Sequence, residues 1–364
     1  MGLPRYDDPA GLVAGTVILQ AISITCVGLR FYTKRWKRQE YLVSDWLILS
    51  ALIFGIGLSV IQIYGIAKQA FGYPLGATIQ DPYAVTGRLN LAKHLELAYL
   101  LVGIVALGLI KLSICFFYWH LFARVMFRRF LMVWIIVIII WATAFVLSGL
   151  LECGSYLLAL FGTPQEYLDH CGSAIPAGYA MVASDILTDF VTLMIPIPVI
   201  LTLQTSTRTR ILTLLTFMIG ALSVGASIAK GYIYITATLG LYTEDAISIL
   251  TGIGIWNLVE VQVGIIAACG PTLRPVLGRI FPGDFASLAS MLGLSKLSSK
   301  LSSKPSSDQL PSFVKTPGSG SEEKLGRTTS EGGSHRSRES SVRGVDTEHE
   351  LTTVDLGGRG GSRV

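Results

Sequence analysis

The sequence predicts an all-α integral membrane protein, a bundle of seven transmembrane helices followed by a disordered cytosolic C-terminal tail. Hydrophobic residues make up 51% of the 364-residue chain and charged residues only 15%, too few charges to cover a soluble domain. Seven apolar runs are each long enough to cross about 30 Å of hydrocarbon. Near residue 284 the composition changes, and Ser, Gly, Lys, Arg and Glu dominate the rest of the chain.

The apolar runs define the expected spans. Because a backbone amide in hydrocarbon must be paired within its own segment, each run is expected to be a helix. The third run is unusually long and begins with polar residues, which predicts that its helix tilts or protrudes from the bilayer. The expected helices cover residues 11–32, 45–67, 94–122, 130–151, 176–203, 211–238 and 246–270.

Three regions follow from these spans: an extracellular N-terminal tail (1–10), a membrane domain (11–280) and a cytosolic tail (281–364). The last has too little apolar surface to offset the entropy of ordering it. Its first part, 282–304, is expected either to lie on the membrane as an amphipathic helix or to begin the disordered tail. The tail also carries candidate phosphorylation sites, namely Thr328, Thr329, Ser330, Ser340 and Ser341.

The orientation follows from the placement of Lys and Arg, which favour the cytosolic side of a membrane. Of 18 such residues before residue 284, 12 fall on the side of the C-terminal tail, four on the opposite side and two inside spans. This split puts the tail in the cytosol and the N-terminus outside. The expected location is the plasma membrane, with an endomembrane as the alternative. The twelve residues are Arg30, Lys34, Arg35, Lys37, Arg38, Arg124, Arg128, Arg129, Arg208, Arg210, Arg274 and Arg279.

Two cysteines bracket a polar loop on the predicted outer side. Cys153 and Cys171 stand at its ends, and the loop between them contains no Lys or Arg. The outer side is oxidising, so we expect these cysteines to form a disulfide, with two free thiols as the alternative.

Five ionisable residues lie within the spans, where a charge is costly and usually paired or functional. At a rise of about 1.5 Å per residue, the depth of Lys230 matches that of Asp185, and Lys111 matches Asp189 or Glu260. We therefore expect Lys111 to be a charged ammonium paired with one or both of those two carboxylates. Whether the network only fixes helix packing, or forms a ligand, proton or switch site, stays open.

Neighbouring residues complete the candidate site. Trp256 and Asn257 lie beside Glu260 and could line a pocket or make interhelical contacts. The full set of ligand or ion-network candidates is Lys111, Asp185, Asp189, Lys230, Trp256, Asn257 and Glu260.

Two further patterns concern the movement of helices. Pro196 and Pro198 predict a kink in the fifth span. In the sixth span, Ala221, Gly225 and Ala229 recur every four residues, which predicts close contact with another helix. Such a pair of helices could move, although both features also occur in static bundles.

Several chemistries are not expected. A retinal Schiff base needs a buried lysine, which microbial rhodopsins place in the seventh helix, and residues 246–270 contain none. The five histidines are scattered over the tail and both membrane sides, so no three can meet around a metal ion. We assign no catalytic residues, no metal and no cofactor, and expect no enzymatic activity. Nucleic acid is not an expected partner, because the basic residues sit in short clusters between spans.

Stretches over about residues 10–280 resemble the fungal rhodopsin domain family in order and spacing. The family comprises seven-helix proteins of filamentous fungi; some look like receptors, and others are encoded in secondary-metabolite clusters, such as the satratoxin-cluster membrane protein. The matching stretches are Arg30-Phe31-Tyr32 with Asp45-Trp46, Lys111-Leu112-Ser113 with Phe117-Tyr118, Cys153 with Cys171, Asp185 with Pro196-Ile197-Pro198, Trp256 with Glu260, and Gly264-Ile265-Ile266-Ala267-Ala268-Cys269 with Pro271-Thr272-Leu273-Arg274-Pro275.

The chain departs from the family pattern at three places. Ser44 stands where a second Asp is usual, Trp119-His120-Leu121-Phe122 lacks the usual arginine, and there is no cysteine-rich N-terminal domain. The family name does not imply retinal.

Two functions are expected from these observations. The first is a receptor-like protein that senses a small extracellular or membrane-borne ligand and contacts a cytosolic signalling partner through its loops and tail. The alternative is a transporter or accessory factor of a fungal secondary-metabolite pathway. Inverted repeats would favour transport, and the sequence shows none. Membrane lipid surrounds the protein in either case.

Overall fold

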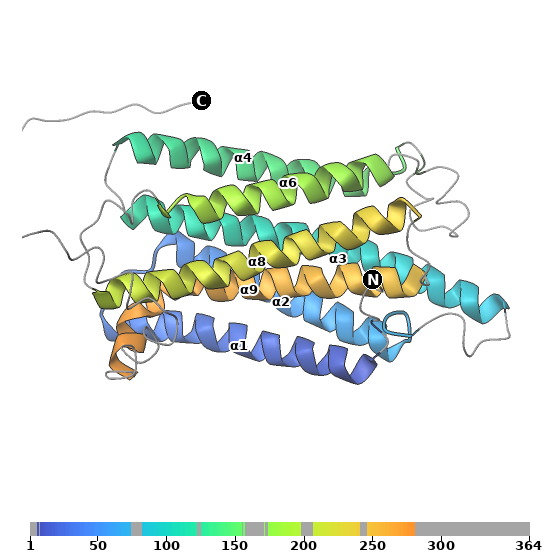
Figure 1. Cartoon of the computed structure of the whole chain (residues 1–364), viewed down its shortest axis with the longest axis horizontal. Coiled ribbons are helices and arrows are strands. Elements are labelled where there is room, and N and C mark those ends of the chain that lie inside the picture. Colours follow the sequence, from blue (N-terminus) through green and yellow to red (C-terminus); the bar gives the residue numbers. More distant parts are fainter. Residues whose placement is uncertain are drawn as a thin grey trace, which may run out of the picture. The chain divides into compact units, whose positions relative to one another are not determined.

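Seven long helices run alongside one another in the computed structural model (Figure 1). The structure describes residues 6, 8–73, 82–121, 125–154, 156, 171, 174–197, 207–240 and 246–280, and within these ranges the structure contains no strand. The helices are α1 (Pro9–Trp36), α2 (Val43–Ala67), α3 (Pro82–Leu121), α4 (Val125–Leu150), α6 (Ala174–Met194), α8 (Thr207–Thr238) and α9 (Ala246–Ile280).

All seven helices are long and apolar enough to cross a membrane, which confirms the predicted fold class. The expected protrusion of the third span is also visible, because α3 has 40 residues and its first turns extend past the neighbouring helices (Figure 1). The expected tail, including segment 282–304 and the candidate phosphorylation sites, lies outside the described residues.

The fifth span differs most from expectation. It was predicted to continue to residue 203 with a kink. Helix α6 ends at Met194, the chain turns at Ile195 and Pro196, and Ile197 is helical again, while residues 198–203 lie outside the described residues. Proline lacks a backbone N–H and clashes with the preceding turn of a helix, so the residue expected to bend the helix stands just beyond its end. Pro198 lies outside the described residues.

The first helix shows how local chemistry fixes a boundary. The Asp8 side chain accepts a 3.2 Å hydrogen bond from the Ala10 backbone N–H, and Pro9 occupies the first helical position. Both are common at helix starts. At the other end, Lys34 and Arg35 lie in the last turn, where positive charge complements the helix dipole.

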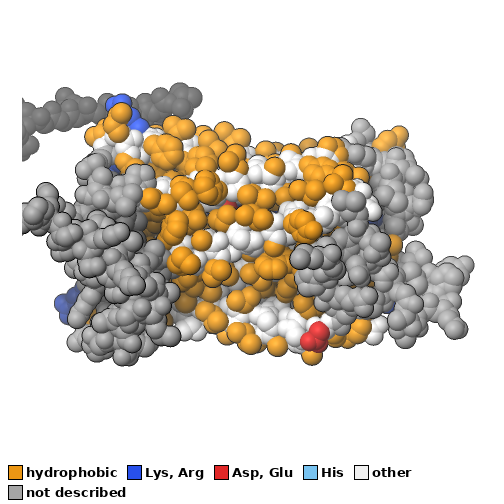
Figure 2. Space-filling view, in the orientation of Figure 1, with side chains coloured by type: hydrophobic (Ala, Val, Ile, Leu, Met, Phe, Trp, Pro, Cys, Tyr) orange, Lys and Arg blue, Asp and Glu red, His pale blue; other side chains and the backbone are white. Residues whose placement is uncertain are grey.

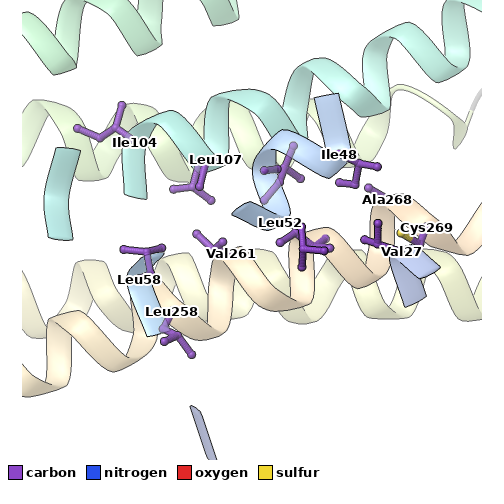
Figure 3. Packing of buried hydrophobic residues seen from close by; sticks show 14 of the residues in the cluster. Val27, Ile48, Leu52, Leu58, Ile104, Leu107, Leu258, Val261, Ala268 and Cys269 are labelled. Atoms are coloured by element: carbon purple, nitrogen blue, oxygen red, sulfur yellow. The ribbon is translucent and has the colours of Figure 1, made fainter. Parts of the chain in front are cut away.

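Two helices form the centre of the bundle. Helix α9 packs against α1, α2, α3 and α8, and α3 packs against α2, α4, α6 and α9. Their shared core is apolar, as the facing side chains of Leu52, Leu107 and Val261 show (Figure 3). This arrangement places any polar side chain on the inner faces of α3 and α9 in a dry environment.

The outward faces are apolar as well. A broad hydrophobic band covers the middle of the molecule, and most of the charged side chains in view lie toward its ends (Figure 2). A surface this apolar would associate in water, whereas in lipid it is the expected exterior. Ile53, Val60, Ile140 and Leu222, on three different helices, are each 60% to 65% exposed. The chain is therefore a multi-pass membrane protein.

The small-residue face predicted on the sixth span is wrong. Gly225 of α8 is exposed, and an added methyl group there would meet nothing within 4 Å. The close approach of α8 to α6 occurs at Gly231, where a Cβ atom would lie 2.8 Å from Val182 and 3.1 Å from Ile186. The close contact with α6 thus involves Gly231, which is not one of the predicted residues, and not Gly225.

This difference predicts opposite effects for two glycine substitutions in one helix. Gly231→Ala should lower the free energy of unfolding by about 1–3 kcal/mol, because the methyl group overpacks the α6–α8 contact. Gly225→Ala, the matched control, should be neutral or stabilising by up to about 1 kcal/mol, since alanine favours a helix. Thermal unfolding of the purified protein in detergent measures both. Equal effects of the two changes would contradict the observed packing.

Candidate functional site

A cluster of five charged side chains lies in the middle of the bundle. Lys111 comes from α3, Asp185 and Asp189 from α6, Lys230 from α8 and Glu260 from α9. Asp185 and Asp189 are four residues apart and therefore share one face of α6. The side chain of Asp189 is 10% exposed, whereas those of Asp185 and Glu260 are fully buried.

Lys111 finds its oxygen partners on α6. Its Nζ atom lies 2.8 Å from Asp185 Oδ1, 3.0 Å from Asp189 Oδ1 and 2.7 Å from the Thr188 hydroxyl. The ammonium also lies 4.4 Å from the centre of the Trp141 ring, a favourable cation–π geometry. Lys111 therefore donates two hydrogen bonds and has a second carboxylate at ion-pair distance.

Lys230 joins α8 to both neighbouring helices. Its Nζ atom lies 2.7 Å from Asp185 Oδ2 and 2.6 Å from Glu260 Oε2, with Asn257 Oδ1 at 3.5 Å. Asp185 thus bridges the two ammonium groups, one through each carboxylate oxygen. The cluster connects α3, α6, α8 and α9 through charge-assisted hydrogen bonds, which are stronger than neutral ones.

The depths read from the sequence gave part of this arrangement. The expected pairs Lys230–Asp185 and Lys111–Asp189 are present. Glu260 contacts Lys230, and no ion pair joins it to Lys111 in the described structure. Depth along an axis does not specify which way a side chain points around the helix, so it could not separate these partners.

Other members of the network were missed. Ser227 donates a 2.6 Å hydrogen bond to Asp189 Oδ2, and Thr188 contacts Lys111. Thr188 stands three residues after Asp185, on the same face of the helix, so helical spacing could have identified it.

Trp256 and Asn257 have different roles. The Trp256 indole N–H donates a 2.7 Å hydrogen bond to the Tyr6 hydroxyl, so this side chain anchors a residue that precedes α1. Asn257 contacts Lys230 and lines a large cavity. Of the two, the structure brings only Asn257 to the cluster.

That cavity, of about 510 Å³, lies between α3, α4, α6, α8 and α9. Its size is typical of a small-molecule site. Lys230 and Asn257 place the charge cluster against its wall. Most of the remaining lining is apolar, and includes Leu97, Leu100, Phe145, Met181 and Ile253.

Two polar groups in the cavity wall have unusual surroundings. Glu96 Oε2 and the Tyr99 hydroxyl are buried, yet have no hydrogen-bond partner among the described residues. Buried polar atoms are nearly always hydrogen-bonded, so these two are candidates for contacts with a bound molecule. The sequence marked Glu96 only as a polar residue at the start of a span.

The predicted disulfide is present beside this cavity. Cys153 and Cys171 are bonded, and join the residues that follow α4 to those that precede α6. Leu97 packs against both cysteines and also lines the cavity. The cross-link therefore restrains the wall of the cavity.

A second ionic cluster joins the other ends of α1, α2 and α9. Arg30 is fully buried; its guanidinium donates to Asp45 Oδ1 at 2.8 Å, to the Ala268 carbonyl at 2.7 Å and to the Ser44 hydroxyl at 3.1 Å. Lys34 pairs with the other oxygen of Asp45. Arg30 and Lys34, counted from the sequence as loop residues, are thus internal contacts of the bundle.

The two ion-pair partners of Lys111 predict a specific double-mutant result. Lys111→Met should lower the free energy of unfolding by about 3–5 kcal/mol, because it leaves buried carboxylates uncompensated. Adding Asp189→Asn should recover part of that loss. Adding Glu260→Gln serves as the control and should recover less, since Glu260 contacts Lys230. Thermal unfolding in detergent gives the comparison, and equal recovery by the two double mutants would contradict the observed pairing.

Comparison with known proteins agrees with this architecture. The model of the fungal rhodopsin domain matches residues 29–279. A polyenoic acids biosynthesis gene cluster protein of Metarhizium anisopliae is 26% identical over 317 residues, which cover 84% of each chain. No solved structure matches the chain. Because the domain model matches more than half of its length, this chain belongs to the fungal rhodopsin domain family.

Proposed function

We propose that this protein is a receptor-like membrane protein that binds a small, mostly apolar molecule in the cavity beside the charge cluster. The observation that carries the proposal is that two residues of the cavity wall also belong to the ionic network. Lys230 and Asn257 line the cavity and at the same time belong to the network that joins α3, α6, α8 and α9. A ligand acts on a conformational equilibrium only through differential contacts with its states, and a molecule touching Lys230 would have such contacts.

The lining supports a particular kind of ligand. Its apolar side chains suit a hydrocarbon or aromatic body, while Glu96 and Tyr99 offer buried oxygen atoms to a polar end group. The proposed orientation places this cavity toward the outer side, together with the disulfide, because basic residues gather at the other ends of the helices. A ligand would then enter from outside or from the outer leaflet.

We assign no catalytic step to this site. The two described histidines, His94 and His120, lie on α3, about 39 Å apart along the helix axis. Asp185 and Asp189 belong to one helix and are both paired with lysine. These arrangements favour binding over hydrolysis.

A second function has support from one relative. The Metarhizium anisopliae protein is described as belonging to a polyenoic acids biosynthesis gene cluster, and an apolar cavity would suit a long unsaturated product. The protein would then be a transporter or accessory factor of a metabolite pathway. Deleting its gene separates the two functions: loss of a metabolite favours the pathway role, whereas loss of a transcriptional response to an added compound favours the receptor.

Filling the cavity should abolish ligand binding. We expect medium-chain polyenoic acids, or the matching alcohols, to raise the Tm of the purified protein in detergent, because a ligand at a hundred times its Kd stabilises by about 2.7 kcal/mol. Ala177→Trp, in the cavity wall, should remove that shift. Ala180→Trp, at an exposed position of the same helix, should keep it. A shift that survives Ala177→Trp would place binding elsewhere.

The proposed orientation has its own test. An epitope attached to the C-terminus should be protected when protease is added to intact cells or sealed right-side-out vesicles, because basic residues are more numerous on that side and favour the cytosol. Permeabilised cells supply the control, in which the epitope should be cleaved. Cleavage without permeabilisation would reverse the topology.

A further inference from the structure

The charge cluster contains more acid than base. Three carboxylates, Asp185, Asp189 and Glu260, face two ammonium groups. Fully ionised, the five side chains would carry one uncompensated negative charge at a fully buried position. Such a charge is strongly disfavoured in a low-dielectric interior.

Counting hydrogen bonds shows which carboxylate is left without compensation. Both oxygens of Asp185 accept from lysine, while Asp189 has one oxygen at ion-pair distance from Lys111 and accepts from Ser227 through the other. Glu260 Oε2 accepts from Lys230, but Glu260 Oε1 is buried with no partner among the described residues. Lys111 donates to Asp185 and Thr188, and Lys230 donates to Asp185, Asn257 and Glu260 Oε2. Within the described structure neither lysine donates to Oε1.

The surroundings of Glu260 contain no further positive charge in the described structure. Facing it are Lys111 from α3, Asp185 and Asp189 from α6, and Lys230 from α8. The polar side chains that α1 and α2 place near this part of α9 are uncharged, namely Gln20, Ser23, Ser59 and Gln62.

From this geometry we propose that the cluster is a proton-binding site, with one proton held on Glu260 and exchangeable through the large cavity. A proton on Oε1 makes Glu260 neutral, and two ammonium groups then face two aspartates. Access follows from Lys230, which lines the cavity and lies 2.6 Å from Glu260. The step is simple addition of a proton from water to a carboxylate. Any molecule that draws Lys230 away from Glu260 would alter how tightly the proton is held.

Infrared spectroscopy of the purified full-length protein tests this site directly. At neutral pH the spectrum should contain the carbonyl stretch of a protonated carboxylic acid, shifted in D₂O. Glu96 also has a buried, unpartnered carboxylate oxygen, so the comparison is made in a Glu96→Gln background. Adding Glu260→Gln to that background should remove the remaining band. Adding Glu40→Gln, at an exposed position, is the matched control and should leave it in place. A band that persists when both Glu96 and Glu260 are replaced, or no band in the Glu96→Gln variant, would overturn the proposal, and a band unmoved in D₂O would refute exchange.

Further measurements distinguish a proton on Glu260 from the effects of misfolding and from a bound metal cation. Carbon-13 labelling of glutamate alone should shift the band in the unaltered protein, whereas labelling of aspartate should not. Glu260→Gln, which resembles the neutral acid, should keep nearly the original Tm, while Asp185→Asn should lower it by about 10 °C. If sodium ions raise the Tm while the carboxylic acid band is absent, the site holds a metal cation and the proton assignment fails.

Discussion

The Asp185 carboxylate between two ammonium groups is the interaction on which the centre of this bundle depends. Lys111 and Lys230 come from different helices, and each would be very costly in hydrocarbon alone. Asp185 accepts a hydrogen bond from each lysine through a different oxygen. This pairing lowers the cost of burying the two ammonium groups and links α3 and α8 to α6. A buried network of this kind specifies geometry more than it adds stability. It determines how the four helices can sit together.

Two residues belong both to the proposed binding cavity and to the contacts that hold the helices together. Lys230 and Asn257 belong to the wall of the large cavity and to the ionic network. Near the opposite ends of the helices, Arg30 ties α1, α2 and α9 together through Asp45, Ser44 and Ala268. Of the two ionic clusters, only the first borders the large cavity. Changes imposed from the cavity would therefore act first on α3, α6, α8 and α9, and would reach α1 and α2 through α9.

Sequence alone was sufficient for the features that depend only on position along the chain. Span length, apolar composition and cysteine position gave the seven helices and the Cys153–Cys171 bond, and depth gave two of the four ion pairs. It failed where rotation about a helix axis decides the outcome. Glu260 points to Lys230, Gly225 points away from α6, and Glu96 faces a cavity because of how neighbouring helices pack. These directions are set by tertiary contacts that no single segment encodes.

Arg30 and Lys34 bear on the insertion of the protein into the membrane as well as on its folded structure. Both reside in α1, whereas their partner Asp45 follows later in the chain. In the proposed orientation these ends of the helices face the cytosol, and the two charges would be available to orient α1 while it inserts, before Asp45 has followed it. The buried pairs with Asp45 would then form only once α2 is in place. The same two residues would in that case act first on topology and afterwards on helix packing.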